Sequence, residues 1–255
     1  MFLSRSDRHE FRLYRRNRRR RRLTLFLLVV LALYVAAAWH HGPAPAARHQ
    51  HATIPPTTSP STHPRPASKP RTAAAGTALS WTGFHGIALP VSAQDGPRHT
   101  RGGLAWGFSD TRRGALLAAV NIAVRTAAQW GPAIYQPTIR NQVTGPDASA
   151  LLRADASDYA ALRAATRVRA GQPAGRGYAA ETAYRYDAWT GTTAAVDIVT
   201  TGPGAGSTAV LAVTRIRLTW QRGDWRVIAP PGGNWASSAT TTASLTGYTT
   251  FPGER

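Results

Sequence analysis

Cysteine is absent from this chain of 255 residues, and histidine is absent after His99. Without cysteine there can be no disulfide, no thiolate metal site and no cysteine nucleophile. A histidine-based triad or a three-histidine metal site in the last two thirds of the chain would have only His85 and His99 to draw on. We therefore predict no metal, no cofactor and no catalytic residue, and expect that the protein is not an enzyme.

Acidic residues are also scarce, at 12 against 31 basic ones, for a formal charge of +19. The distribution of that charge is uneven. Residues 1–22 hold ten arginines against Asp7 and Glu10, a net +8, and residues 40–78 contribute a further +4. The remaining +7 on residues 79–255 describes a mildly basic domain and gives little support to nucleic-acid binding.

The seventeen residues from Leu23 to Trp39 carry no charge and are predominantly apolar. This length is near the lower limit for crossing a hydrocarbon core of about 30 Å. Because arginines crowd its N-terminal side, the positive-inside rule predicts a basic cytoplasmic tail over 1–22, a transmembrane helix over 23–39 and everything after it outside the cell membrane. Cleavage as a signal peptide near Ala36-Ala37-Ala38 is the alternative. An arginine arm that binds nucleic acid is a third interpretation.

Residues 40–78 are rich in Pro, Thr and Ser, with "TIPPTTSPSTHPRPASKP" at their centre. A segment with so few apolar residues cannot bury a core, so we predict a disordered linker. Fully extended, it could reach on the order of 100 Å. Such a tether could let residues 79–255, an extracytoplasmic domain, stand well above a membrane.

The domain opens with turns predicted at Gly83, Gly86 and Gly96-Pro97. Apolar residues at helical spacing then predict an amphipathic helix in "SDTRRGALLAAVNIAVRTAAQWGP", capped by Ser109 or Asp110 and ended by Gly131-Pro132. A second amphipathic helix is predicted in "PDASALLRADASDYAALRAAT", capped by Asp147. Each helix needs a partner to cover its apolar side.

The last third changes to the alternating pattern of strands. Four such segments are separated by short turns, the last of them at Gln221-Arg222-Gly223-Asp224. Short connections between alternating strands predict an antiparallel meander with one solvated face. Helices followed by a sheet define an α+β fold, in which we expect the helices to pack on the concave side of a curved antiparallel sheet.

Carboxylates and tyrosines lie close together in these predicted strands. Asp187, Asp197 or Glu181 among tyrosines could have a raised pKa and act as a base. The alternative pairs Glu181 or Asp187 with arginines of neighbouring strands, and the arginines at 215, 217 and 226 could form a basic stripe. The candidates for a pocket or an interaction surface are Tyr184, Tyr186, Asp187, Asp197, Arg215, Arg217, Trp220 and Trp225.

The hairpin "LTWQRGDWRVI" (Leu218 to Ile228), following a membrane helix, a linker and two helices, resembles the nuclear-transport-factor-2-like superfamily in its membrane-anchored bacterial forms. These include the eighth-subunit VirB assembly factors of type IV secretion and their Gram-positive conjugation counterparts. A second likeness, carried by "WTGFHGIALPVSAQDGP" and "GFSDTRRGALLAAVNIA", is to a domain of actinobacterial conjugative elements. The resemblance implies a cone of helices on a curved sheet and no catalytic residue.

The resulting expectation is a non-catalytic, single-pass scaffold of a conjugative-transfer or type IV secretion-like apparatus. Its expected partners are the cytoplasmic membrane through residues 23–39, other subunits of the apparatus and a second copy of the chain. We expect no direct contact with nucleic acid. The alternative is an exported pocket protein that binds or acts on a small ligand between helices and sheet.

Overall fold

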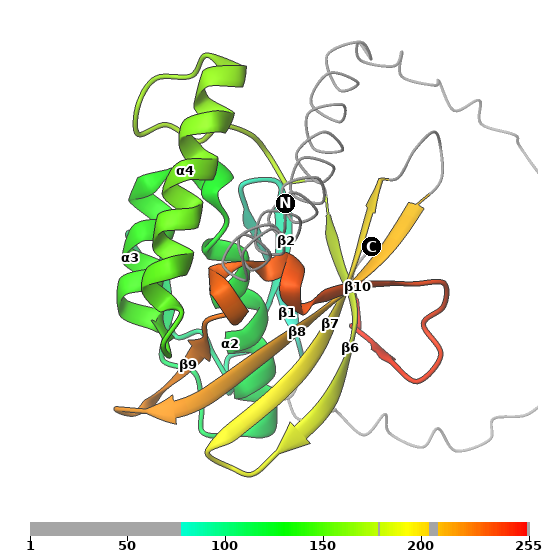
Figure 1. Ribbon diagram of the computed structural model, residues 1–255. Helices are drawn as coiled ribbons and strands as arrows, with labels where there is room; N and C mark the ends of the chain where they lie inside the picture. The colour runs from blue at the N-terminus through cyan, green and yellow to red at the C-terminus, as the bar shows by residue number, and fades with distance from the viewer. Residues whose placement is uncertain (1–77, 178, 204–208, 254–255) are drawn as a thin grey trace, which may run out of the picture. The chain divides into compact units, whose positions relative to one another are not determined.

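The computed structural model describes residues 78–253 apart from Tyr178 and residues 204–208 (Figure 1). The predicted tail, membrane helix and nearly all of the predicted linker lie outside the described residues. In the part of the chain that the structure describes, no helix is long and apolar enough to cross a membrane.

Two small hairpins occupy the start of the domain. In the first, β1 (Ser80–Phe84) pairs with β2 (Ile87–Val91), and both turn residues, His85 and Gly86, have positive φ. The predicted turn at Gly83 is therefore wrong, because Gly83 lies inside β1. A Cβ at position 86 would lie 2.9 Å from the carbonyl oxygen of Gly177, so a larger residue would displace that backbone. The second hairpin joins β3 (His99–Arg101) to β4 (Leu104–Trp106).

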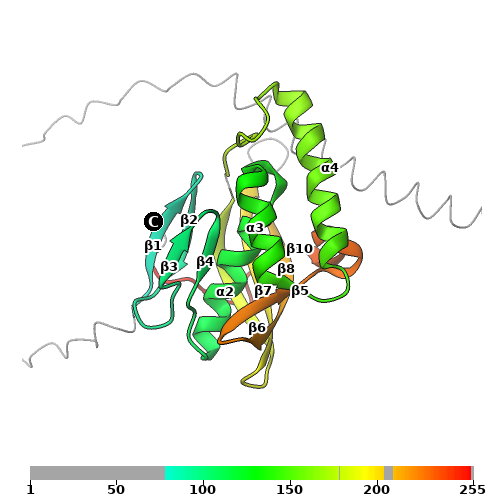
Figure 2. The same ribbon diagram turned by 90° about the vertical axis from the view of Figure 1, so that its left-hand side faces the viewer.

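Helix α2 (Arg112–Arg125) lies between the hairpins and the main sheet (Figure 2). Its N-cap is Thr111, whose Oγ1 accepts a hydrogen bond from the Gly114 amide at 2.9 Å, and not the predicted Ser109 or Asp110. The predicted amphipathic character is also wrong, since every residue from Gly114 to Ile122 is buried. This burial follows from contacts with β2 and β4, with a neighbouring helix and with three strands of the sheet.

Two further helices pack side by side next to α2 (Figure 1). After the short 3-10 helix η1 (Ala128–Trp130), α3 (Pro132–Gln142) begins at the proline that was expected to end a helix. Proline is well suited to a first helical position, where its missing N–H costs no hydrogen bond. The predicted second helix is confirmed as α4 (Ala148–Thr166), preceded by Asp147, although the Asp147 side chain makes no capping hydrogen bond.

The main sheet has seven strands in the order β11-β6-β7-β8-β9-β5, with β10 also paired to β8. Its centre is the predicted meander of β6 (Ala180–Trp189), β7 (Thr193–Pro203), β8 (Ala209–Gln221) and β9 (Asp224–Ile228). The turn at Arg222-Gly223 is confirmed, with positive φ at both residues. The sheet is mixed and not wholly antiparallel as predicted, because β5 (Val143–Thr144) leaves α3 parallel to β9.

The C-terminal segment continues the sheet at both edges. After η2 (Pro231–Gly233) and η3 (Trp235–Ser238), β10 (Ala239–Thr242) pairs with β8, and β11 (Thr249–Thr250) then pairs with β6. Residues 239–251, which we call the strap, therefore cross the face of the sheet that lies away from α2, the outer face. Leu245 and Tyr248 of the strap pack on a small outer-face cluster of Ala183, Val199 and Val213.

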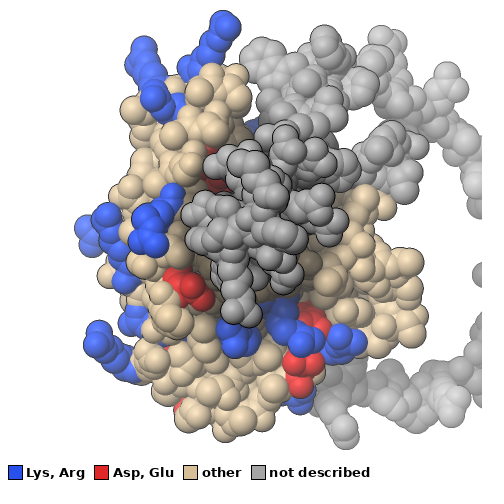
Figure 3. Space-filling view, viewed as in Figure 1, with Lys and Arg blue, Asp and Glu red and all other residues tan. Residues whose placement is uncertain are grey.

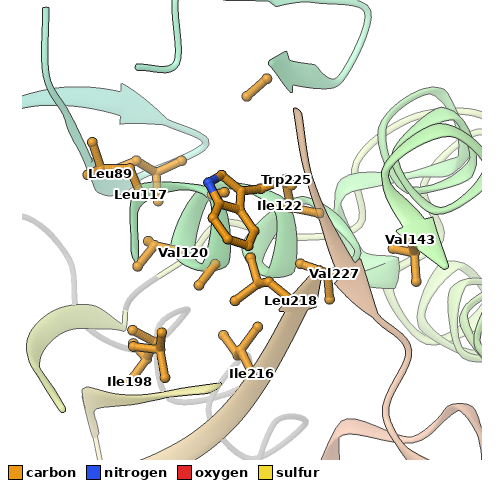
Figure 4. Packing of buried hydrophobic residues seen from close by; sticks show 14 of the residues in the cluster. Leu89, Leu117, Val120, Ile122, Val143, Ile198, Ile216, Leu218, Trp225 and Val227 are labelled. Atoms are coloured by element: carbon orange, nitrogen blue, oxygen red, sulfur yellow. The ribbon is translucent and has the colours of Figure 1, made fainter. Parts of the chain in front are cut away.

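The main core fills the space between α2 and the inner face of the sheet (Figure 4). Side chains of α2 meet alternate residues of β7, β8 and β9. The buried residues at this contact are Leu116, Leu117, Val120, Ile122, Val196, Ile198, Ile216, Leu218, Trp225 and Val227, each at most 3% exposed. The α+β class is thus confirmed, with a helix packed against the inner face of a mixed sheet.

Candidate functional site

The eight predicted site residues are divided between the two faces of the sheet. Strand alternation and side-chain contacts place Asp187, Asp197, Arg215 and Arg217 on the outer face. Tyr184, Tyr186, Trp220 and Trp225 pack against the main core on the inner face. The structure therefore does not bring the eight residues together in one pocket.

The outer face carries an ion-pair network centred on Asp197, which is only 2% exposed. Arg185, Asp197 and Arg215 stand directly opposite one another on β6, β7 and β8. Arg185 Nη2 donates to Asp197 Oδ2 at 2.7 Å, and Arg215 Nε donates to Asp197 Oδ1 at 2.8 Å. Arg215 Nη2 also lies 3.0 Å from Asp187 Oδ1. Figure 3 shows the resulting mixture of basic and acidic side chains over the sheet.

The electrostatics of this network are those of a structural ion pair. Burial raises the pKa of Asp197, but the hydrogen bonds from Arg215 and Arg185 outweigh burial and hold the pKa below its usual value. This is the reverse of the raised pKa that a general base would need. The alternative prediction, ion pairs between neighbouring strands, is confirmed for Asp187 and Arg215. The residue at the centre of the network, however, is Asp197. Arg185 is further covered by Tyr248 of the strap, whose ring centroid lies 4.7 Å away.

The aromatic residues of the inner face position the start of α2. Trp225 is 1% exposed, and its Nε1 donates to the carbonyl oxygen of Ser109 at 2.9 Å. The hydroxyl of Tyr186 donates to the carbonyl oxygen of Arg112 at 2.7 Å, while the Arg112 guanidinium lies over the same ring. Burial raises the pKa of Tyr186, so its hydroxyl stays protonated at neutral pH. These contacts explain the aromatic residues as anchors for a helix.

A second carboxylate cluster, at the start of α2, was missed by sequence reasoning. Asp95 accepts hydrogen bonds from Thr111 Oγ1 at 2.7 Å and from Ser109 Oγ at 2.8 Å, and it forms an ion pair with Arg113. Burial raises its pKa, but the bonds from Thr111, Ser109 and Arg113 bring the pKa below its usual value. The sequence around Asp95 indicates only a turn, because its partners come 14 to 18 residues later.

Two buried ionisable side chains lack an oppositely charged partner among the described residues. Asp155 on α4 is 8% exposed, and its Oδ2 accepts no hydrogen bond. Burial, with a smaller effect from Asp158, raises its pKa to about 8. Arg125, at the end of α2, is 3% exposed and donates to the Asn121 backbone and side chain. Burial lowers its pKa to about 10.

Asp155 carried a usable signal in the sequence. It lies four residues after Leu151 and four before Tyr159, both buried, so helical spacing alone puts a carboxylate on the apolar stripe. A perturbed pKa at a buried acid can mark a functional site. Within the described ranges, however, no group of three or more acidic or histidine side chains is placed to hold a metal ion.

The fold and these contacts define a small α+β domain with a packed core and an ion-paired sheet face. The model of one family, described as "Domain of unknown function (DUF8175)", matches residues 42–250, and the chain belongs to this family. The match begins within the predicted linker. No curated protein and no solved structure matches the chain.

Proposed function

We propose that the protein is a membrane-anchored, extracytoplasmic scaffold subunit of a conjugative-transfer or secretion-like apparatus, without catalytic activity of its own. The proposal joins two observations. The arginine block before an uncharged run of seventeen residues supports a single-pass anchor with the domain outside. The domain itself offers surfaces rather than reactive groups.

The observation that carries the non-catalytic part is the state of Asp197, the most buried of the carboxylates that were candidates for a base. Two arginines bind it, and its pKa is held low, so it is ionised and occupied. The space between α2 and the inner face, where a superfamily member would hold a ligand, is filled by buried apolar side chains (Figure 4). This packing supports a scaffold over the alternative of a pocket protein.

A relationship to the nuclear-transport-factor-2-like cone forms part of the proposal. Helices packed on one face of a meander that ends in the Leu218–Ile228 hairpin support it. The parallel strand β5 and the strap are additions to that plan. Both cover sheet edges that would otherwise offer unpaired backbone groups to other chains.

The absence of cysteine allows a direct test of topology. A single cysteine introduced by S4C or by T100C can be labelled in intact cells with a membrane-impermeant maleimide. Thr100 is exposed on β3 and its hydroxyl makes no hydrogen bond to the described residues, so the substitution should be tolerated. We expect labelling at position 100 in intact cells and at position 4 only after lysis. The opposite pattern would remove the basis for an extracytoplasmic scaffold.

The role in an apparatus is tested genetically. Deletion of the coding region should abolish transfer or secretion, and the wild-type chain should restore it. The R217Q and R226Q variants serve as controls. They alter outer-face arginines without touching the Asp197 network. Both should accumulate normally and retain any activity that depends only on the fold. Normal transfer in the deletion strain would end the proposal.

A further inference from the structure

The end of α4 and the loop after it form a surface of one charge. Arg163 lies in the last turn of α4, and Arg167, Arg169 and Arg176 follow in the loop before β6. The sequence has no acidic residue between Asp158 and Glu181. All four arginines are exposed, Arg163 on the helix and the other three on the loop, and none forms an ion pair or a hydrogen bond with a described residue. Figure 3 shows basic side chains gathered at this end of α4.

The backbone that carries these arginines, residues 163–177, which we call the arginine loop, is fixed at several points. Tyr159 of α4 donates its hydroxyl to the carbonyl oxygen of Gln172 at 2.8 Å. The Ala174 amide donates to the Gln129 carbonyl at 2.8 Å, and the Gly177 amide donates to the His85 carbonyl at 2.9 Å. The four charges are therefore held by an anchored backbone, so that less ordering is needed when an anion binds them.

A fifth positive charge lies beneath the same end of the domain. The guanidinium of Arg125 lies 4.4 Å from the ring centroid of Phe84, and Phe84 contacts His85, whose carbonyl holds the arginine loop. Arg125 bonds only to Asn121 and forms no ion pair with any carboxylate in the described ranges. Its charge therefore adds to the positive potential at this end without a local counter-charge.

The outer sheet face is a weaker candidate for binding an anion. Two of its arginines, Arg185 and Arg215, are already committed to Asp197 and Asp187. An incoming anion would have to compete with carboxylates at 2.7 to 3.0 Å. The arginine loop has no such competitor, and guanidinium groups match the oxygens of phosphate well.

We propose that the arginine loop is a docking surface for the phosphate groups of anionic phospholipid, so that the tethered domain can lie down on the membrane that anchors it. The inference rests on the proposed membrane anchor. Each basic side chain strengthens association with an anionic lipid surface by roughly fivefold, so four give on the order of several hundredfold. Such an association is weak for a free protein, but a tether supplies an effective concentration of about a millimolar and makes it significant.

The test uses the full chain reconstituted into vesicles of neutral phospholipid alone or with phosphatidylglycerol added. A donor dye is attached at A170C, an exposed position within the arginine loop, and an acceptor dye is attached to lipid headgroups. We expect energy transfer to rise several-fold in the anionic vesicles and to return to the neutral-vesicle value in high salt. Equal transfer in both kinds of vesicle would overturn the proposal.

Charge-matched variants separate the arginine loop from net charge. The variant R163Q/R167Q/R169Q/R176Q should lose the anionic increase. The control R101Q/R140Q/R153Q/R222Q removes four exposed arginines that also lack described partners, including Arg140 in a last helical turn and Arg222 at positive φ. It should keep most of the increase. Equal losses in the two variants would show a general charge effect and contradict the assignment.

The anchor is scored separately by flotation after carbonate extraction. A chain that fails to float with vesicles lacks the proposed anchor, and the arginine loop is then tested by adding that chain to vesicles at millimolar lipid. Binding to anionic vesicles that the fourfold loop variant abolishes would support the docking surface alone. Binding to inorganic polyphosphate without binding to vesicles would overturn the lipid assignment.

Discussion

Asp197 on the outer sheet face and Asp155 on α4 are buried to nearly the same degree, at 2% and 8% exposure. Their surroundings differ. Asp197 receives hydrogen bonds from two arginines, whereas Asp155 Oδ2 receives none and has Asp158 as a neighbour of like charge. The pKa of Asp197 is lowered and that of Asp155 is raised, so burial alone does not determine whether a carboxylate is charged.

The difference follows from the elements that carry the two residues. In the sheet, cross-strand register puts Asp197 between Arg185 and Arg215, one on each neighbouring strand. On α4, the same face that carries Asp155 carries Leu151 and Tyr159 and packs on α3, η1 and η2. A sheet can thus offer charged partners in register on both sides, while an apolar helix stripe offers none.

The largest effect is expected from removing a partner of Asp197. R215M should lower the free energy of unfolding by about 2–3 kcal/mol, because it leaves a buried carboxylate with one arginine. The value is below that for fully buried pairs, since the Arg215 side chain is 46% exposed. Urea unfolding followed by tryptophan fluorescence measures the change.

A second variant distinguishes lost charge pairing from lost packing. R215M/D197L removes the buried carboxylate together with its partner, so it should recover most of the loss, as apolar replacements of buried ion pairs commonly do. A double variant as unstable as R215M alone would show that packing of the Arg215 stem, and not the ion pair, is what stabilises the outer face.

Asp155 should show the opposite response. D155N should raise the free energy of unfolding by about 2 kcal/mol at pH 8, because the buried group no longer has to be kept protonated or ionised without a partner. The matched control is D147N, at the start of the same helix, where the side chain makes no capping hydrogen bond. The measurement is thermal unfolding of the two variants at pH 8. An equal change in melting temperature for D155N and D147N would contradict the idea that the buried, unpartnered carboxylate of Asp155 is the cause.

The pH dependence of stability sharpens the contrast. The folded pKa of Asp155, about 8, lies above its ordinary value of 3.8, so the folded chain holds an extra proton between these values. The stability that this proton contributes is complete below about pH 4 and is lost as the pH rises through about 8. The folded pKa of Asp197 is lowered, so its contribution is present above about pH 4 and is lost as the pH falls further. D155N should remove the fall in stability between about pH 4 and pH 8 and leave the loss at lower pH unchanged.

Strand alternation is a local property, so the sequence could assign side chains to the two faces of the meander. Arg215 and Arg217 alternate with Ile216 and Leu218, which is enough to assign the two faces of β8. The four-strand meander follows from such patterns and from short turns. Asp197 as the centre of the network required the register of three strands, which residue patterns do not provide.

Other features depended on contacts distant in the sequence. The burial of α2 on all sides comes from hairpins and helices that cover its polar as well as its apolar positions. Helix α3 was missed because Gly131-Pro132 serves as the start of a helix as readily as the end of one. The strap has a Ser- and Thr-rich sequence that predicts no strand, and only the open edges of β8 and β6 make it one.

The smallest expected effect concerns the strap as a cover for the outer-face network. Y248L removes the ring that lies over Arg185 but keeps an apolar side chain against Ala183 and Val199, so the melting temperature should fall by only about 1–3 °C. Y248F keeps the ring and is the matched control. In amide hydrogen exchange, Y248L should expose residues 239–251 before the meander itself. A strap that opens independently leaves the register of β6, β7 and β8 intact. Uniform loss of protection across these three strands would therefore mean that the strap and the Asp197 network unfold as one unit.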